Sequence, residues 1–197
     1  MPCPSFSTPA ADCRTGSKLR LIKGSVCATC YAHNRGNYCR PNVKSLRVYN
    51  LDGIRANKTA AHWKAWGDAM VATIGESKHG GYFRWHDSGD VQSLAHLTAI
   101  AYIAGKLTHI DFWLPTKEKG FLLAFIRAHG NFPVNLTVRL SAPMVDGTAP
   151  KAWTLTSTVY TTTPIGTECR AYTQGGECVD CRACWDKTIP NISYPKH

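Results

Sequence analysis

The stretch Tyr82-Phe83-Arg84-Trp85-His86-Asp87-Ser88-Gly89-Asp90 decides how this 197-residue chain folds. Its aromatic first half follows the turn-forming pair Gly80-Gly81 and therefore predicts a strand. Its polar second half predicts the end of that strand and the entry into a helix from Val91 to about Leu107. A buried strand that leads through a short polar turn into a helix is the repeating unit of an α/β protein.

The same alternation continues on both sides of this unit. Residues 59–74 predict a helix with Trp63, Trp66, Met70 and Ile74 on one apolar face. Further strands are expected at residues 19–22, 109–114, 134–140 and 155–161, and a further helix at residues 118–128. This order predicts an α/β fold with a largely parallel sheet, wrapped as a small or partial (β/α) barrel-like domain that carries cysteine-rich metal-binding segments at both ends.

The chain is expected to form one domain in three segments. These are an N-terminal cysteine loop over residues 1–40, a βα core over residues 41–165 and a C-terminal cysteine segment over residues 166–197. A hydrophobic content of 44% is enough to bury a core. No apolar run approaches the roughly 20 residues that cross a bilayer. We therefore expect a soluble protein without a membrane partner, in a reducing cytoplasm, which is the host cytoplasm if the protein is viral.

The cysteines point most directly to chemistry, because none of the nine lies between Cys39 and Cys169. The C-terminal group places Cys178, Cys181 and Cys184 at two-residue intervals, with Cys169 upstream. Three closely spaced thiolates and one remote thiolate are a common way to hold an iron–sulfur cluster. These four residues are the predicted ligands of one metal site.

The N-terminal cysteines are more loosely spaced. Cys27 and Cys30 are the best candidates for metal ligands, joined by some of Cys3, Cys13 and Cys39. One or two clusters are possible, because the two groups either bind separately or share one cluster across the barrel mouth. The cofactor is expected to be a 4Fe-4S cluster. Structural zinc is the alternative, since paired Cys-x2-Cys units also hold zinc, whereas the odd number of cysteines disfavours a disulfide framework.

Polar residues follow the predicted strands and are expected to meet at one edge of the sheet. His86 suits a general base or metal ligand beside Asp87, whose carboxylate can fix an imidazole tautomer. Asp90 suits catalysis or, more simply, the N-cap of the next helix. Lys117 and Arg139 are candidates for binding an anion at the mouth of the barrel. No phosphate loop or nucleophile elbow accompanies these five candidates.

The charge of the chain is unevenly distributed. The net charge is +10, and the first 66 residues hold eleven Lys or Arg against two Asp. A basic field of this kind favours anionic partners, such as nucleic acid, an anionic small molecule or an acidic redox partner.

Three motifs together resemble the bacteriophage gene product 88 family: Cys27-Ala-Thr-Cys30-Tyr31-Ala32, the stretch 83–90, and Cys178-x2-Cys181-x2-Cys184-Trp185. The resemblance extends over nearly the whole chain. The layout of that family is similar to radical S-adenosylmethionine proteins, which are partial or complete (β/α) barrels with a cysteine loop after the first strand. In those proteins a Gly-Gly-Glu-like motif after the second strand helps to hold S-adenosylmethionine. The resemblance therefore implies a cofactor site at Ser88, Gly89 and Asp90.

One position departs from the radical pattern. That pattern is Cys-x3-Cys-x2-Cys, and Lys23 stands where the first cysteine is expected. The first functional prediction is therefore a phage iron–sulfur protein in redox or electron-transfer work. The alternatives are an enzyme that uses S-adenosylmethionine and a nucleic-acid-associated module with structural zinc.

Overall fold

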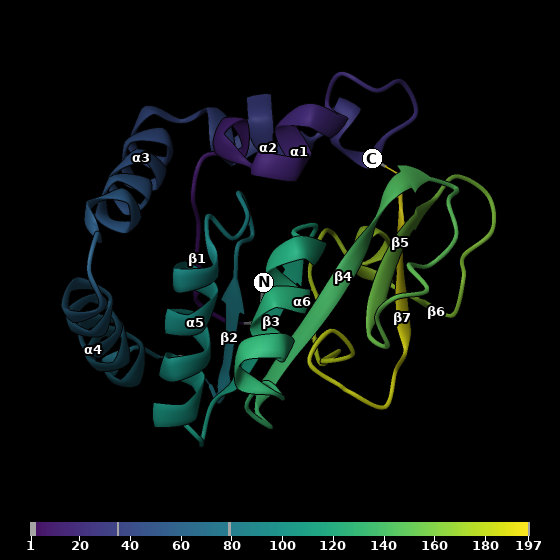
Figure 1. Cartoon of the computed structure of the whole chain (residues 1–197). Helices are drawn as coiled ribbons and strands as arrows, with labels where there is room; N and C mark the ends of the chain where they lie inside the picture. The colour runs from purple at the N-terminus through teal and green to yellow at the C-terminus, as the bar shows by residue number, and fades with distance from the viewer. Residues whose placement is uncertain (1–2, 35, 79, 197) are drawn as a thin grey trace.

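The structure is a computed structural model that describes residues 3–34, 36–78 and 80–196. Its centre is one seven-stranded sheet in the order β1-β2-β3-β4-β5-β7-β6, in which every strand pair is parallel (Figure 1). The strands are β1 (Ser5–Phe6), β2 (Tyr82–Trp85), β3 (Asp111–Thr116), β4 (Leu136–Val145), β5 (Thr156–Tyr160), β6 (Thr167–Glu168) and β7 (Asn191–Pro195). The predicted parallel α/β fold is confirmed, but over the described residues the sheet stays open rather than closing into a barrel, with β1 and β6 at its edges.

Six α-helices accompany the sheet in the described ranges. They are α1 (Arg14–Leu19), α2 (Tyr31–Asn34), α3 (Pro41–Ala56), α4 (Ala60–Glu76), α5 (Leu94–Lys106) and α6 (Lys119–His129). Short 3-10 turns lie at η1 (Ala10–Asp12), η2 (Val26–Thr29), η3 (Gly36–Cys39) and η4 (Ala171–Thr173). None of these helices is long and apolar enough to cross a membrane.

Helices α5 and α6 cover one face of the sheet, and α4 packs outside α5 (Figure 1). Alternate strand residues point into this layer, because successive side chains of a strand face opposite ways. Phe83 and Trp85 of β2 and Phe112 and Leu114 of β3 are buried there. Each such side chain stabilises the fold by about 1.5–3 kcal/mol.

The opposite face of the sheet is polar and is covered by the C-terminal cysteine segment. Trp185 of this segment lies between the rings of Tyr82 and Trp113, at centroid distances of 5.4 and 5.3 Å. Its indole nitrogen donates to the carbonyl oxygen of Phe83 at 3.1 Å. The segment between β6 and β7 is therefore packed into the fold rather than appended to it.

The carboxyl ends of the strands point toward α1 and α2, which lie beyond the arrowheads in Figure 1. The predicted strand at residues 19–22 is wrong, since α1 ends at Leu19 and the chain then turns, with Leu21 88% exposed. Of the N-terminal cysteines, Cys3 precedes β1, a two-residue strand, and Cys13, Cys27, Cys30 and Cys39 follow it. Helix α5 begins at Leu94 rather than Val91, because the Ser93 hydroxyl accepts from the amide of His96.

Candidate functional site

A cavity of about 430 Å³ lies at the carboxyl edge of the sheet. Cavities of this size are typical of small-molecule and cofactor sites. Thiols from both ends of the chain line it, namely Cys13, Cys27, Cys30, Cys169, Cys178 and Cys184. All nine cysteines are free. The two predicted cysteine groups therefore meet around one space.

The N-terminal thiol group consists of Cys13, Cys27 and Cys30. Cys13 is the N-cap residue of α1, and Gly16 lies one turn further along. A Cβ atom added to Gly16 would lie 3.6 Å from the sulfur of Cys13, 3.5 Å from that of Cys27, and only 2.9 Å from the Cys13 Cβ. The bare backbone of Gly16 thus leaves room between two thiols. Cys30 is near both, since its charge helps to raise the pKa of each.

A buried cation lies beside the N-terminal thiol group. Burial raises the pKa of Cys27, and the strongest opposing influence is the ammonium of Lys117. That ammonium donates to the carbonyl oxygen of Ala142 at 3.1 Å. Burial lowers the pKa of Lys117, while Cys27 and Asp90 act to raise it. A cation in this place favours the thiolate, the form that binds metals.

Two buried carboxylates join the loops beneath this group. Glu118 accepts from the amide and hydroxyl of Thr15 at 2.7 and 2.9 Å, which ties the first turn of α1 to the end of β3. Asp90 accepts from the Thr116 hydroxyl at 2.5 Å and from the Lys117 amide at 2.8 Å. Burial raises the pKa of Asp90 to about 6. The expected N-cap role of Asp90 is wrong, since Ser93 caps the helix and Asp90 fastens β2 to β3.

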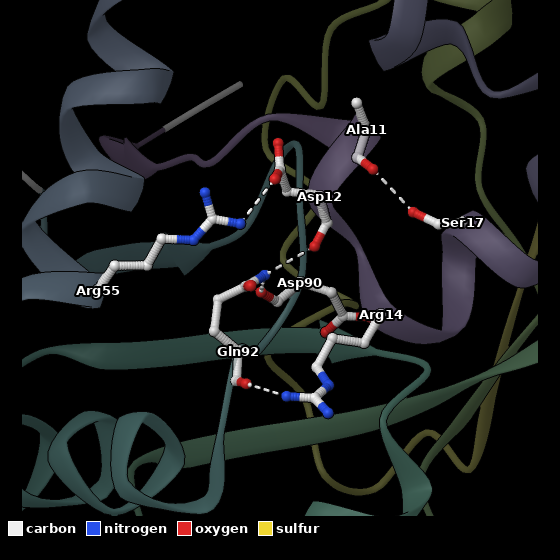
Figure 2. Close-up of polar contacts among 7 residues, drawn as sticks. All are labelled: Ala11, Asp12, Arg14, Ser17, Arg55, Asp90 and Gln92. Carbon is white, nitrogen blue, oxygen red and sulfur yellow. Dashed lines mark hydrogen bonds and ion pairs between the residues drawn. The ribbon is translucent and has the colours of Figure 1, made fainter.

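The backbone before Cys13 is held by the loop after β2 (Figure 2). The guanidinium of Arg14 donates to the carbonyl oxygen of Gln92 at 3.3 Å. The side-chain amide of Gln92 donates to the carbonyl oxygens of Asp12 and Asp90 at 3.3 and 2.9 Å. These contacts place Cys13 at the cavity although it is far in sequence from β2.

The C-terminal thiol group consists of Cys3, Cys169, Cys178, Cys181 and Cys184. The charges of Cys178 and Cys181 both help to raise the pKa of Cys169, and the charge of Cys169 helps to raise the pKa of Cys184. The predicted set of four is therefore brought together. Cys3 is its neighbour too, because Cys178 is among the groups that raise the Cys3 pKa. Cys3, Cys39 and Cys181 do not line the cavity, and Cys39 and Cys181 are exposed. Which cysteines join Cys27 and Cys30 stays a prediction.

Arg84 is the cation beside the C-terminal thiol group, as Lys117 is the cation beside the N-terminal one. Its guanidinium carbon lies 4.4 Å from the centre of the Trp113 ring. Burial raises the pKa of Cys3 to about 11, with Arg84 the first opposing charge, and Arg84 also opposes burial at Cys169 and Cys184. Arg84 was not predicted as a site residue, although a lone cation between Phe83 and Trp85 was a signal for it.

Arg139 does not line the cavity and is fully buried. A guanidinium has five N–H donors, and here all five face carbonyl oxygens. The acceptors, with their distances, are Cys184 (3.0 Å), Ala183 (3.1 Å), Asp186 (2.6 Å), Ile189 (2.9 Å) and Thr156 (3.5 Å). The predicted anion-binding role is therefore replaced by a positioning role, in which Arg139 shapes the loop that carries Cys184.

His86 lines the cavity but does not act with Asp87. The Asp87 carboxylate accepts from Ser7 and, at 3.2 Å, from Tyr38. His86 is 3% exposed, has a φ of 56° and packs edge-on against His96, with ring centroids 5.4 Å apart. Neither of its ring nitrogens makes a hydrogen bond within the described residues. Burial, then Arg84, lowers its pKa to about 3, so the ring is neutral.

The two buried histidines make the fold sensitive to acid. The pKa of His96 is also lowered, well below its usual value, by burial and by His86. Because both folded-state pKa values lie below the unfolded value of about 6.5, their stabilisation is complete above that pH. It is lost as the pH falls below that value, down to about 3 for His86. Between pH 6.5 and pH 5 the shift at His86 should cost about 2 kcal/mol, and the shift at His96 should add to this loss, measurable by urea unfolding. His96→Phe should lower this dependence, whereas replacing exposed His62 by Gln should not; equal slopes would contradict the account.

The residues of the expected cofactor motif line the cavity, but one hydroxyl is already used. The Ser88 hydroxyl donates to the carbonyl oxygen of Thr8 at 2.9 Å, and the Thr8 amide donates to the Ser88 carbonyl oxygen at 3.0 Å. Gly89, with a φ of 82°, lies directly against Thr8. These contacts fasten β1 to β2.

In the ranges that the structure describes, no three or more His, Cys, Asp or Glu side chains form a group that could hold a single metal ion. A cubane makes a different demand, because each thiolate binds its own iron atom. Three thiols of each group line the cavity, and each group has a buried cation beside it. Thiolate sulfurs beside a cation are the donors and the charge that such a cluster takes.

The fold and the site together define an α/β protein with an open parallel sheet and a thiol-lined cavity at the carboxyl edge. The family model described as Gene product 88 matches residues 1–187, and the chain therefore belongs to the gene product 88 family. This confirms the resemblance drawn from the three motifs. No curated protein and no solved structure matches the chain significantly.

Proposed function

We propose that this protein is an iron–sulfur protein that transfers single electrons. The observation that carries the proposal is the convergence of thiols from both ends of the chain on one cavity. Thiolates, not thiols, bind iron, so metal binding must release their protons against the burial that raises the pKa of Cys13 and Cys184. Lys117 and Arg84 offset the negative charge that a thiolate-bound cluster brings into the fold.

The test is the content of iron, acid-labile sulfide and zinc in protein purified without oxygen, with visible spectra before and after dithionite. We expect about eight iron and eight sulfide per chain, and bleaching on reduction. Cys39→Ser should keep both values, since Cys39 is exposed and lies outside the cavity. Zinc without sulfide, or a spectrum that dithionite leaves unchanged, would reject the proposal.

A second candidate is an enzyme that acts on S-adenosylmethionine. The observation that favours it is the cavity itself, since pure electron transfer needs no space of about 430 Å³ beside the N-terminal thiol group. Ser88, Gly89 and Asp90 line that space. The reduced protein, incubated with S-adenosylmethionine, should then release methionine. Full recovery of intact S-adenosylmethionine would leave electron transfer as the function.

A further inference from the structure

We infer that the N-terminal layer of this protein binds single-stranded nucleic acid, with its lysine and arginine side chains on the phosphates and its exposed apolar side chains on the bases. The N-terminal layer is the run of helices and turns over residues 14–34 and 36–58. It crosses the carboxyl edge of the sheet from α3 to α1 (Figure 1). Its members form one continuous layer, since α1 contacts η2, α2 contacts η3, and η3 contacts α3.

The cations of the N-terminal layer are not neutralised by acidic side chains. Between residues 14 and 58 the only acidic residue is Asp52. Five exposed cations lie outside the cavity, and their side chains make no hydrogen bond or ion pair with the residues that the structure describes: Lys18, Lys23, Arg40, Lys44 and Lys58. Positive charges that are gathered without counter-ions repel one another, so an anionic partner would stabilise this surface.

The positive field reaches a histidine in the middle of the layer. The Nη1 atom of Arg20, which caps the end of α1, lies 2.7 Å from the Nε2 atom of His33 in α2. Burial lowers the pKa of His33. The charges of Arg20, Arg47 and Lys44 lower it further. Charges from α1 and α3 therefore act on the same point of α2, as one continuous basic surface requires.

The same layer exposes large apolar side chains that also lie outside the cavity. These are Leu21, Ile22, Leu46, Val48 and Tyr49. The ring of Tyr49 is the clearest of them, because 76% of the residue is exposed. The bases of a single strand present flat faces that stack on such rings, while its phosphates pair with cations. A duplex keeps its bases stacked inside and offers this layer only its charge.

The arrangement of the apolar side chains disfavours a membrane or a second copy of the chain. Leu21 lies in the turn after α1, whereas Leu46 and Tyr49 lie on α3. The apolar stripe of α3, with Leu51 and Ile54, is buried against the protein. A helix that lies on a membrane inserts such a stripe into the lipid. A second copy would bring the same positive charge and be repelled.

The first experiment measures binding to the full-length protein by fluorescence anisotropy. The probes are labelled oligo-dT and oligo-U of about 20 nucleotides, and the tighter of the two shows whether DNA or RNA is preferred. Contact by all five cations would give a slope of about −3.5 when the logarithm of the association constant is plotted against that of the salt concentration. No binding of either strand, or tighter binding of a duplex, of polyglutamate or of phosphatidylserine vesicles, would overturn the inference.

The second experiment places the strand on the layer. The double variant Lys23→Ala, Lys44→Ala should bind about tenfold more weakly at 0.1 M salt and make the slope about 1.4 less negative, because two phosphate contacts are lost. Lys78→Ala, Lys106→Ala is the matched control with the same net charge. Lys78 precedes β2 and Lys106 ends α5, so both lie toward the amino ends of the strands. Equal affinities of the two double variants would contradict the placement.

A third variant separates base contact from charge. Tyr49→Ala should weaken binding of the preferred strand by about fivefold or more and leave the salt slope unchanged, since the ring carries no charge. Tyr49→Phe keeps the ring and should bind as the wild type does. If Tyr49→Ala also binds as tightly as the wild type, the bases are not held and the inference fails.

The iron content of the same preparations keeps this inference apart from the proposed function. All of these variants should hold as much iron as the wild type, because the substituted residues do not line the cavity. A protein that holds iron but binds no strand would retain only the proposed function. A protein that binds the strand but holds no iron would retain only the nucleic-acid surface.

Discussion

Arg139→Lys is expected to release the C-terminal cysteine segment and to lower the free energy of unfolding by about 3 kcal/mol or more. Lysine has three N–H donors in place of five, so at least two of the five carbonyl oxygens lose their partner. Each unpaired buried group costs about 1–3 kcal/mol. If the C-terminal thiol group binds iron as proposed, that iron should be lost as well, since three of the carbonyls belong to residues 183–186.

Urea unfolding and iron analysis of the same preparation would measure both effects. Arg127→Lys is the matched control, because Arg127 is exposed on α6 and should tolerate the change in both assays. A variant at Arg139 that is as stable as this control would show that the carbonyl contacts do not hold the loop.

Gly89→Ala is expected to be the most damaging glycine-to-alanine change, because its added Cβ makes the closest contact of any glycine. Its Cβ would lie 1.9 Å from the Thr8 hydroxyl oxygen and 2.7 Å from the Thr8 carbonyl oxygen, and the carbonyl cannot move without moving β1. The φ of 82° adds about 1–2 kcal/mol of strain. We expect a total loss above about 3 kcal/mol, or no folded protein.

Gly81→Ala separates the two causes. Gly81 has the same φ of 82° and open space around the added Cβ, so it should show the backbone strain alone. Thermal unfolding of both variants gives the difference. Similar melting temperatures would mean that β1 yields easily and that its attachment to β2 contributes little.

The strongly patterned middle of the chain could be predicted from the sequence. Strands β2 to β5 and helices α4 to α6 lie close to their expected ranges, because each is long enough for its period to show. Strand β1 has only two residues, which is too short for an alternating hydrophobic pattern to be recognised. The strand predicted at residues 19–22 was wrong because Leu21 and Ile22 lie in an exposed turn, where an apolar side chain does not indicate burial.

The site was predicted in its residue types more than in its arrangement. The thiols could be predicted because closely spaced cysteines are typical of metal sites. The polar strand ends could be predicted because parallel strands bring their carboxyl ends to one edge of the sheet. The roles of Arg139 and Cys3 depend on contacts across more than 40 residues, which spacing along a chain does not reveal. Alternation in β4, with Thr137 and Arg139 between buried leucine and valine residues, was, like Arg84 in β2, a local hint of a polar buried face.

Part of the N-terminal positive charge has structural uses. Arg47 is buried and donates to the carbonyl oxygen of Ala32 at 3.2 Å, and Arg55 pairs with Asp12 at 2.7 Å. Nucleic-acid binding stays a prediction from the net charge. It would be tested by measuring whether the affinity for nucleic acid falls as the salt concentration rises.

Strand β7 is the last strand along the chain, yet it lies between β5 and β6. The cysteine segment at residues 169–190 connects β6 to β7, and β7 covers the outer hydrogen-bonding groups of β5. If that segment is released, β7 loses its attachment and the backbone amides and carbonyls of β5 are bared. An uncovered strand of this kind readily pairs with strands of other molecules. The cysteine segment therefore also protects the protein against aggregation, and its loss should appear as turbidity before it appears as unfolding.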